Sequence, residues 1–222
     1  MIYLIGCDHC KAQTYAEGSG LDDPQNKTQQ EFKRMLIKAI EDYGPDLIAE
    51  EHHPDLLKTK GERSVALEVA SEYRICHRFC DPSQSERIKL GIGNALPHID
   101  PGALSDWYER IGSEYDAHRH DIAHRWPIRE GFWISQLRND IYKTLVFICG
   151  TLHTYTFKDR LESSGVKSQV IKDAVGCVPA LRDSDAYKAL QDVRVNDFPP
   201  VTDRSDSRCF CISFSTQIQL NL

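Results

Sequence analysis

The apolar positions of this 222-residue chain form short unbroken runs that alternate with amphipathic stretches. Unbroken runs are typical of strands covered on both faces, as in a parallel sheet. Apolar side chains that recur every three or four residues are typical of helices buried along one face. The strands that we predict lie at residues 2–5, 47–51, 75–80, 145–149 and 166–171. The repeated strand-helix order predicts an α/β fold, with a mostly parallel central sheet flanked by helices.

Capping residues place the ends of several predicted helices. Thr28 and Glu31 have the spacing of a capping box, and Gly44 would end that helix. Ser83 and Glu86 repeat the capping-box spacing further along the chain. The remaining helices that we predict span residues 62–74, 103–126, 127–142 and a segment capped by Thr156. The segment 10–25 lacks either period and is predicted to be irregular, either as a binding loop or as plain disorder.

The last fifty residues follow a different pattern from the rest of the chain. Residues 209–216 alternate between apolar and polar side chains, as in a half-buried strand. We therefore expect a core at 1–172 and a C-terminal β extension at 173–222 that packs on the core at a sheet edge. The sequence predicts no oligomeric state.

Charge and composition narrow the range of partners. The net charge is −6, which argues against broad binding to nucleic acid or to an anionic membrane. No apolar run has the length of a membrane span, and the N-terminus lacks a basic leader. We expect a cytoplasmic protein with reduced thiols. Cys7 with Cys10 and Cys76 with Cys80 have spacings that allow a structural zinc site, but buried free thiols are the simpler expectation.

One unit with candidate chemistry occurs twice. An apolar run leads to Gly6 and, three residues later, to His9; a second run leads to Gly150 and His153. Open α/β sheets bind ligands beyond the carboxyl ends of their strands, where both histidines would lie. The predicted strand at 47–51 ends in a pair of carboxylates, Glu50 and Glu51. Coincidence between two buried strands is the alternative, but the matching apolar runs favour one shared site.

Two chemistries suit two imidazoles and one carboxylate. His9, Glu51 and His153 form a familiar ligand set for a divalent metal such as Mn, Co or Zn. Without metal, a neutral imidazole takes a proton from water while a carboxylate orients it. Both routes give an activated water molecule.

These motifs together resemble the TraB/Tiki and erythromycin esterase/ChaN-like superfamily. The resemblance rests on the two GxxH units, on Glu51 at the end of a PDxxxxE segment, on an aspartate after the third strand, and on Arg129 and Glu130 opening a helix. It implies that His9, Glu51, His153 and, with them, Arg129 and Glu130 line one catalytic site. The function it implies is hydrolysis of an ester, lactone or amide bond in a small molecule or peptide. The alternative it leaves open is a ChaN-like module that binds haem or another small ligand without turnover, with a free histidine beside Tyr15 or Tyr155 as the axial ligand.

Further histidines have plainer explanations. His52 and His53 follow the second strand, where we expect surface residues of a loop. His120 and His124 are spaced one helical turn apart and are expected on a solvated helix face.

Overall fold

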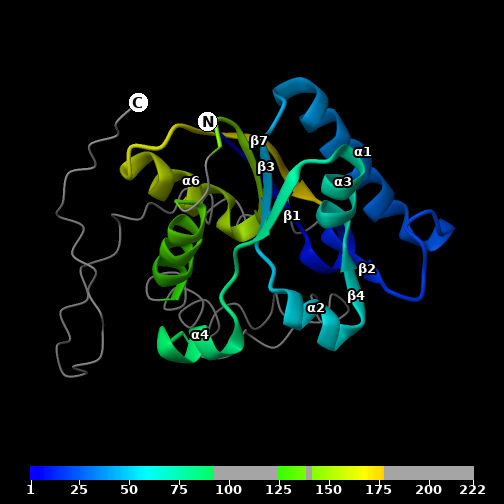
Figure 1. The fold of residues 1–222 in the computed structure, drawn as a ribbon, viewed down its shortest axis with the longest axis horizontal. Coiled ribbons are helices and arrows are strands. Elements are labelled where there is room, and N and C mark those ends of the chain that lie inside the picture. Colours follow the sequence, from blue (N-terminus) through cyan, green and yellow to red (C-terminus); the bar gives the residue numbers. More distant parts are fainter. Residues whose placement is uncertain (93–124, 139–141, 178–222) are drawn as a thin grey trace, which may run out of the picture.

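A five-stranded, wholly parallel sheet forms the centre of the protein. The computed structural model describes residues 1–92, 125–138 and 142–177. The strand order is β5-β3-β6-β1-β7, and helices lie on both faces of the sheet (Figure 1). The strands are β1 (Ile2–Cys7), β3 (Leu47–Glu50), β5 (Cys76–Phe79), β6 (Leu145–Gly150) and β7 (Ser168–Val175). The predicted α/β fold with a parallel central sheet is confirmed.

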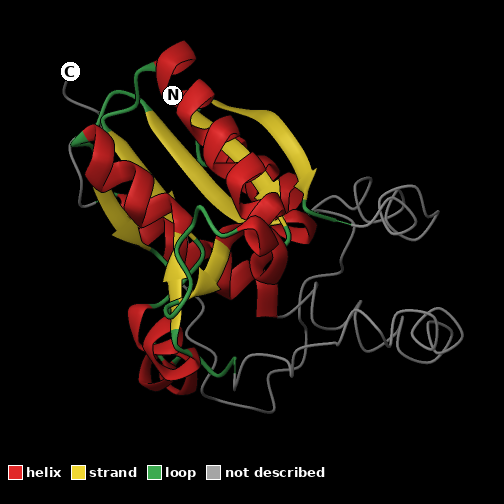
Figure 2. Ribbon diagram, turned by 90° about the vertical axis from the view of Figure 1, so that its right-hand side faces the viewer, coloured by secondary structure: helices red, strands yellow, loops and turns green. Residues whose placement is uncertain are grey.

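Two apolar layers cover the sheet, as the strands seen between helices in Figure 2 indicate. On one face, α1 (Lys27–Tyr43) and α3 (Val65–Tyr73) pack on alternate strand residues such as Ile5 and Ile148. On the other face, α6 (Thr154–Ser163) and a helix at residues 125–137 pack on the intervening ones. Both faces of β6 are therefore buried, because its side chains alternate between the two layers.

Helix ends depend on local capping. α1 begins after Asn26, which makes no side-chain cap, so the capping box predicted from Thr28 and Glu31 is wrong. Gly44 ends α1 with a left-handed backbone, at φ 54°. The box predicted from Ser83 and Glu86 is confirmed at the start of α4 (Gln84–Lys89).

The segment after β1 is more ordered than the sequence suggests. A π-helical turn at His9–Gln13 leads into β2 (Thr14–Ala16), which pairs antiparallel with β4 (Glu62–Ser64). The irregular loop predicted for residues 10–25 is thus wrong in its first half, and the helix predicted from residue 62 begins at Val65. Short strands that pair only with each other have little apolar periodicity, which explains why the sequence pattern did not reveal them.

Several boundaries in the second half of the chain also differ from the prediction. The helix predicted at 127–142 includes residues 125 and 126 and ends at residue 137. A 3-10 turn at Thr151–His153 runs directly into α6, so Thr156 lies inside that helix and does not cap it. β7 continues to Val175, three residues beyond the predicted end of the core at 172. Residues 103–124 of the helix predicted at 103–126, with His120 and His124, lie outside the described residues, as does the C-terminal β extension from 178 onward.

The sheet also bears on the zinc site that the cysteine spacing allowed, and the helices bear on the expectation that no segment spans a membrane. Cys7 ends β1 and Cys80 follows β5, and β3 and β6 lie between these strands, so about 14 Å of sheet separates Cys7 from Cys80, whose spacings allowed a shared zinc site. In the part of the chain that the structure describes, no helix is both long and apolar enough to cross a bilayer.

Candidate functional site

Three adjacent strands bring the candidate residues to one edge of the sheet. β6 lies between β3 and β1, and all three run in the same direction. Glu51 follows β3, His9 follows β1 and His153 follows β6. The chain places β1 and β3 first and later inserts β6 between them, which is the arrangement that opens a binding crevice in doubly wound sheets.

The two GxxH units end differently although their strands are neighbours. Gly6 pairs with Cys149 and Cys7 with Gly150, so the second unit lies one residue further along the sheet. His9 begins a π-helical turn, whereas His153 ends a 3-10 turn. A Cβ atom on Gly150 would lie 2.7 Å from His9 Nε2, so glycine at this position leaves room for the imidazole.

Glu51 is the centre of the site. Its Oε2 accepts a hydrogen bond from the Gly150 amide at 2.7 Å and lies 3.4 Å from His9 Nε2. Its Oε1 lies 2.6 Å from Arg129 Nη1 and 3.8 Å from His153 Nε2. Burial is the largest influence on the pKa of Glu51 and raises it, but the charges of Arg129 and the two histidines outweigh burial and hold that pKa well below its usual value.

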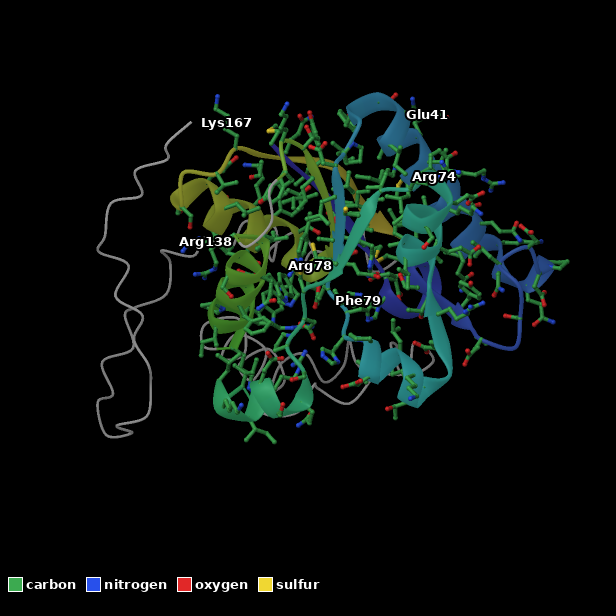
Figure 3. The ribbon with its side chains drawn as sticks, in the orientation of Figure 1. Glu41, Arg74, Arg78, Phe79, Arg138 and Lys167 are labelled. Carbon is green, nitrogen blue, oxygen red and sulfur yellow. The ribbon has the colours of Figure 1, made fainter. Side chains whose placement is uncertain are left out.

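Arg129 reaches this carboxylate from the helix at residues 125–137. Its Nε donates to Asp81 Oδ1 at 2.6 Å, and its Nη1 lies 3.3 Å from His153 Nε2. Asp81 follows β5, whose last residues Arg78 and Phe79 are labelled near the middle of Figure 3, and also accepts from Trp133 Nε1 at 3.1 Å. Burial lowers the pKa of Arg129, but the carboxylates of Glu51 and Asp81 outweigh that effect, so the guanidinium is a permanent charge here.

The same arrangement decides how well a divalent metal fits. An ion bound by Glu51 Oε1 and His153 Nε2 would lie between these atoms, where Arg129 Nη1 lies within 2.6 and 3.3 Å of them. A guanidinium therefore takes the position of the cation, and the residues as arranged do not fit a divalent ion. Among the described residues, no three His, Cys, Asp or Glu side chains are grouped as metal ligands.

His153 is held on its other side by a second buried carboxylate. Its Nδ1 lies 3.0 Å from Glu130 Oε1, which also accepts from Thr156 Oγ1 at 2.6 Å. Arg160 Nε donates to the other oxygen of Glu130 at 3.0 Å. A carboxylate with these donors is an acceptor, so His153 carries its proton on Nδ1 and turns Nε2 toward Arg129 and Glu51.

His9 is the more accessible imidazole. Its side chain is 30% exposed, against 7% for His153. Its Nδ1 lies 2.6 Å from Gln13 Oε1. Burial lowers the pKa of His9, but the charge of Glu51 and the hydrogen bonds to Glu51 and Gln13 outweigh burial and raise that pKa above 6.5.

Glu50 points to the opposite face of the sheet from Glu51, as strand alternation requires. Its Oε1 accepts from Ser64 Oγ at 2.5 Å and lies 2.9 Å from His77 Nε2. Of the two adjacent glutamates, Glu51 is the one in contact with both site histidines. The sequence alone left both assignments open.

Sequence patterns missed two residues near the site, and a third was placed wrongly. Gln13 and His77 had no motif to mark them. His52, expected on the surface, is only 8% exposed, and its ring lies 5.2 Å from that of His9. Its Nε2 has no hydrogen-bond partner among the described residues, and burial lowers its pKa to about 4, so this imidazole is neutral at physiological pH.

Comparison with known proteins adds no assignment. No family model matches the chain, and neither a curated protein nor a solved structure is similar to it. Function must therefore be inferred from the site.

Proposed function

We propose that this protein is a hydrolase that cleaves an ester, lactone or amide bond in a small molecule or peptide, with His9 as the general base. The observation that carries the proposal is the position of His9: a partly exposed imidazole, 3.4 Å from a buried carboxylate, at the ligand-binding edge of a parallel sheet. The resemblance to erythromycin esterase-like proteins points to the same class of reaction.

His9 and Glu51 have different roles in the proposed reaction. A water molecule gives a proton to His9 Nε2 as its oxygen attacks the carbonyl carbon, and the carbonyl oxygen becomes an oxyanion. The negative charge of Glu51 stabilises the imidazolium that forms. When the scissile bond breaks, His9 returns the proton to the leaving oxygen or nitrogen.

Arg129 is the group best placed to stabilise the oxyanion. Its side chain is 20% exposed, and its Nη2 makes no hydrogen bond to another described residue. The Nη1 and Nε atoms are anchored by Glu51 and Asp81, so the guanidinium is preorganised before substrate arrives. We assign positioning roles to His153, whose Nε2 lies 3.3 Å from Nη1, and to Glu130, which contacts the other nitrogen of that imidazole.

The proposed reaction uses no divalent metal, because Arg129 supplies the fixed positive charge. This is the second of the two chemistries that suit the His-Glu-His set. The haem-binding alternative has less support, since Tyr15, one of the two tyrosines suggested beside the axial histidine, is 5% exposed and donates a hydrogen bond to Glu68. A Soret band in the purified protein would favour that alternative.

The test is hydrolysis of a panel of activated esters, lactones and peptides by the wild type and by His9→Gln. We expect His9→Gln to lower kcat/KM by about 10²–10⁴-fold, the usual contribution of a general base. A matched control is His53→Gln, which alters a half-buried histidine that caps α2 (Pro54–Lys60) and does not contact the site.

Chelation separates the two chemistries. Incubation with a chelator should leave the wild-type rate unchanged. A rate that disappears on chelation and returns with Mn, Co or Zn would instead support the metal site of His9, Glu51 and His153. An unchanged rate in His9→Gln would refute the role of this histidine in either form.

A further inference from the structure

A chain of hydrogen bonds connects His9 to Glu50, across the end of the sheet from the candidate site. His9 Nδ1 lies 2.6 Å from Gln13 Oε1, and Gln13 Nε2 donates to Glu50 Oε2 at 2.6 Å. Glu50 is fully buried and contacts neither Arg129 nor His153. The proposed reaction gives it no direct part.

Donor and acceptor chemistry fixes the direction of each bond in this chain. A carboxylate only accepts, so Gln13 must turn its NH₂ group toward Glu50. Its carbonyl oxygen then faces His9 and also only accepts. His9 Nδ1 must therefore be the donor, which leaves Nε2 without a proton when the imidazole is neutral.

We propose that Glu50, acting through Gln13, is a positioning residue that sets the tautomer of His9, with the proton on Nδ1 and a free lone pair on Nε2. The consequence for catalysis rests on the proposed hydrolase function, since only the free Nε2 accepts a proton from water. The tautomer itself is a property of the resting protein.

The neighbouring Glu51 explains why the tautomer of His9 must be set by the hydrogen bond to Gln13. Glu51 Oε2 lies 3.4 Å from His9 Nε2 and attracts a proton to that atom. Without an acceptor at Nδ1, neutral His9 would donate from Nε2 to Glu51 and lose its capacity as a base. The bond from Nδ1 to Gln13 opposes that attraction.

The residues around Glu50 fix the hydrogen bond between Gln13 and Glu50. Ser64 and His77 bind Oε1 at 2.5 and 2.9 Å, which leaves Oε2 for Gln13. Ser64 is paired with Thr14, the residue after Gln13, in the ribbon of β2 and β4. The ribbon therefore fixes both ends of the bond between Gln13 and Glu50.

The experiment measures the tautomer directly, with no substrate. Long-range ¹H–¹⁵N correlation spectra of ¹⁵N-histidine-labelled full-length protein distinguish a protonated from an unprotonated ring nitrogen. Spectra are taken above the titration of His9, and a His9→Gln sample assigns its signals. We expect the Nδ1–H form to dominate in the wild type and to become the minor form in Glu50→Gln, because the new amide allows Gln13 to turn over.

Two further variants make the result decisive. Gln13→Met removes the acceptor at Nδ1 and should also shift His9 to the Nε2–H form, which tests the proposal if Glu50→Gln fails to fold. Ser64→Ala removes one bond to Glu50 but keeps its bond to Gln13, so the tautomer should not change. An Nδ1–H form that persists in folded Glu50→Gln and Gln13→Met would overturn the proposal.

The activity assays are read separately. Loss of the Nδ1–H form together with at least a tenfold fall in kcat, at unchanged KM, is the full expected result. If the tautomer of His9 shifts as expected but the protein hydrolyses no substrate, the role of Glu50 in setting the tautomer is confirmed and the proposed hydrolase function is refuted.

Discussion

His9 and His153 have the same motif but different electrostatic partners. A carboxylate, Glu130, holds Nδ1 of His153, whereas a neutral amide, Gln13, holds Nδ1 of His9. A carboxylate at Nδ1 orients a ring and stabilises its charged form, while an amide only orients it. Glu51, at the Nε2 side, is therefore the main source of negative charge for His9, and its contribution can be tested.

Removal of the Glu51 charge should lower the pKa of His9. In the wild type that pKa is raised above 6.5, and Glu51 is the largest contribution that raises it. In Glu51→Gln the opposing effects of burial and of Arg129 remain, so we expect the pKa of His9 to fall below its wild-type value. The measurement is the titration of the His9 ring by NMR.

Asp42→Asn serves as the control for that titration, because Asp42 is an exposed carboxylate paired with Lys38 and should leave His9 unaffected. In the proposed reaction only the neutral form of His9 acts as a base. His9 is protonated below its pKa, so the rate should rise as pH increases through that pKa. If His9 titrated at the same pH in Glu51→Gln and in the wild type, Glu51 would not be its charged partner.

At the scale of elements, the glycines of the two strand ends have different neighbours. A Cβ atom on Gly150 would meet the ring of His9 at 2.7 Å, in a side chain that is partly exposed. A Cβ atom on Gly6 would lie 2.2 Å from both Asp173 Oδ1 and Thr154 Oγ1, in the packing between β1, α6 and β7. Gly150 therefore leaves room for the side chain of His9 in the site, whereas Gly6 allows β1 to pack closely against α6 and β7.

Alanine at these positions should separate the two roles. Gly150→Ala should displace His9, alter its titration and abolish hydrolysis, while the free energy of unfolding falls by less than about 1 kcal/mol. Gly6→Ala should lower that free energy by about 1–3 kcal/mol, the usual cost of overpacking. Urea unfolding and the His9 titration measure both effects. Equal losses of stability in the two variants would contradict this division.

At the scale of the whole molecule, acid should destabilise the fold in two steps. Burial lowers the pKa of His52 from the usual 6.5 of a histidine to about 4 in the folded protein, because it disfavours the charged imidazole. The unfolded chain therefore binds a proton first as pH falls below 6.5, and stability is lost from there down through pH 4. Glu50, Glu51 and Asp81 have lowered pKa values, so their contributions are lost at lower pH, below the usual range of carboxylates.

The first step can be assigned to one residue. Between pH 7 and pH 5 the His52 effect should cost roughly 2 kcal/mol of unfolding free energy, and His52→Gln should remove that cost because an amide does not titrate. The raised pKa of His9 acts in the opposite direction over the same range, so the comparison is between wild type and variant at each pH. Urea unfolding at both pH values is the measurement, with His53→Gln as the control. An identical pH dependence in wild type and His52→Gln would show that His52 is not the group that titrates.

The sequence by itself determined the strands and the edge at which the histidines lie. The unbroken apolar runs of β1 and β6, together with the repeated strand-helix order, were sufficient to predict the parallel sheet, because burial of a strand on both faces requires apolar side chains at every position. Strand direction then placed His9 and His153 at one edge, since parallel strands all end on the same side. Short polar elements such as β2 and β4 escaped prediction, because they contribute almost nothing to the apolar pattern.

Only the tertiary structure decided what surrounds each side chain. β3, β6 and β1 lie side by side, and Glu51 reaches across the end of β6 to lie near both histidines, while alternation along β3 places Glu50 on the other face. Arg129, far away in the sequence, occupies the position that two imidazoles and a carboxylate would otherwise offer to a metal ion. Local sequence patterns record which residues are buried, but charge neutralisation and tautomer choice depend on atoms within about 4 Å, which folding brings together from distant parts of the chain.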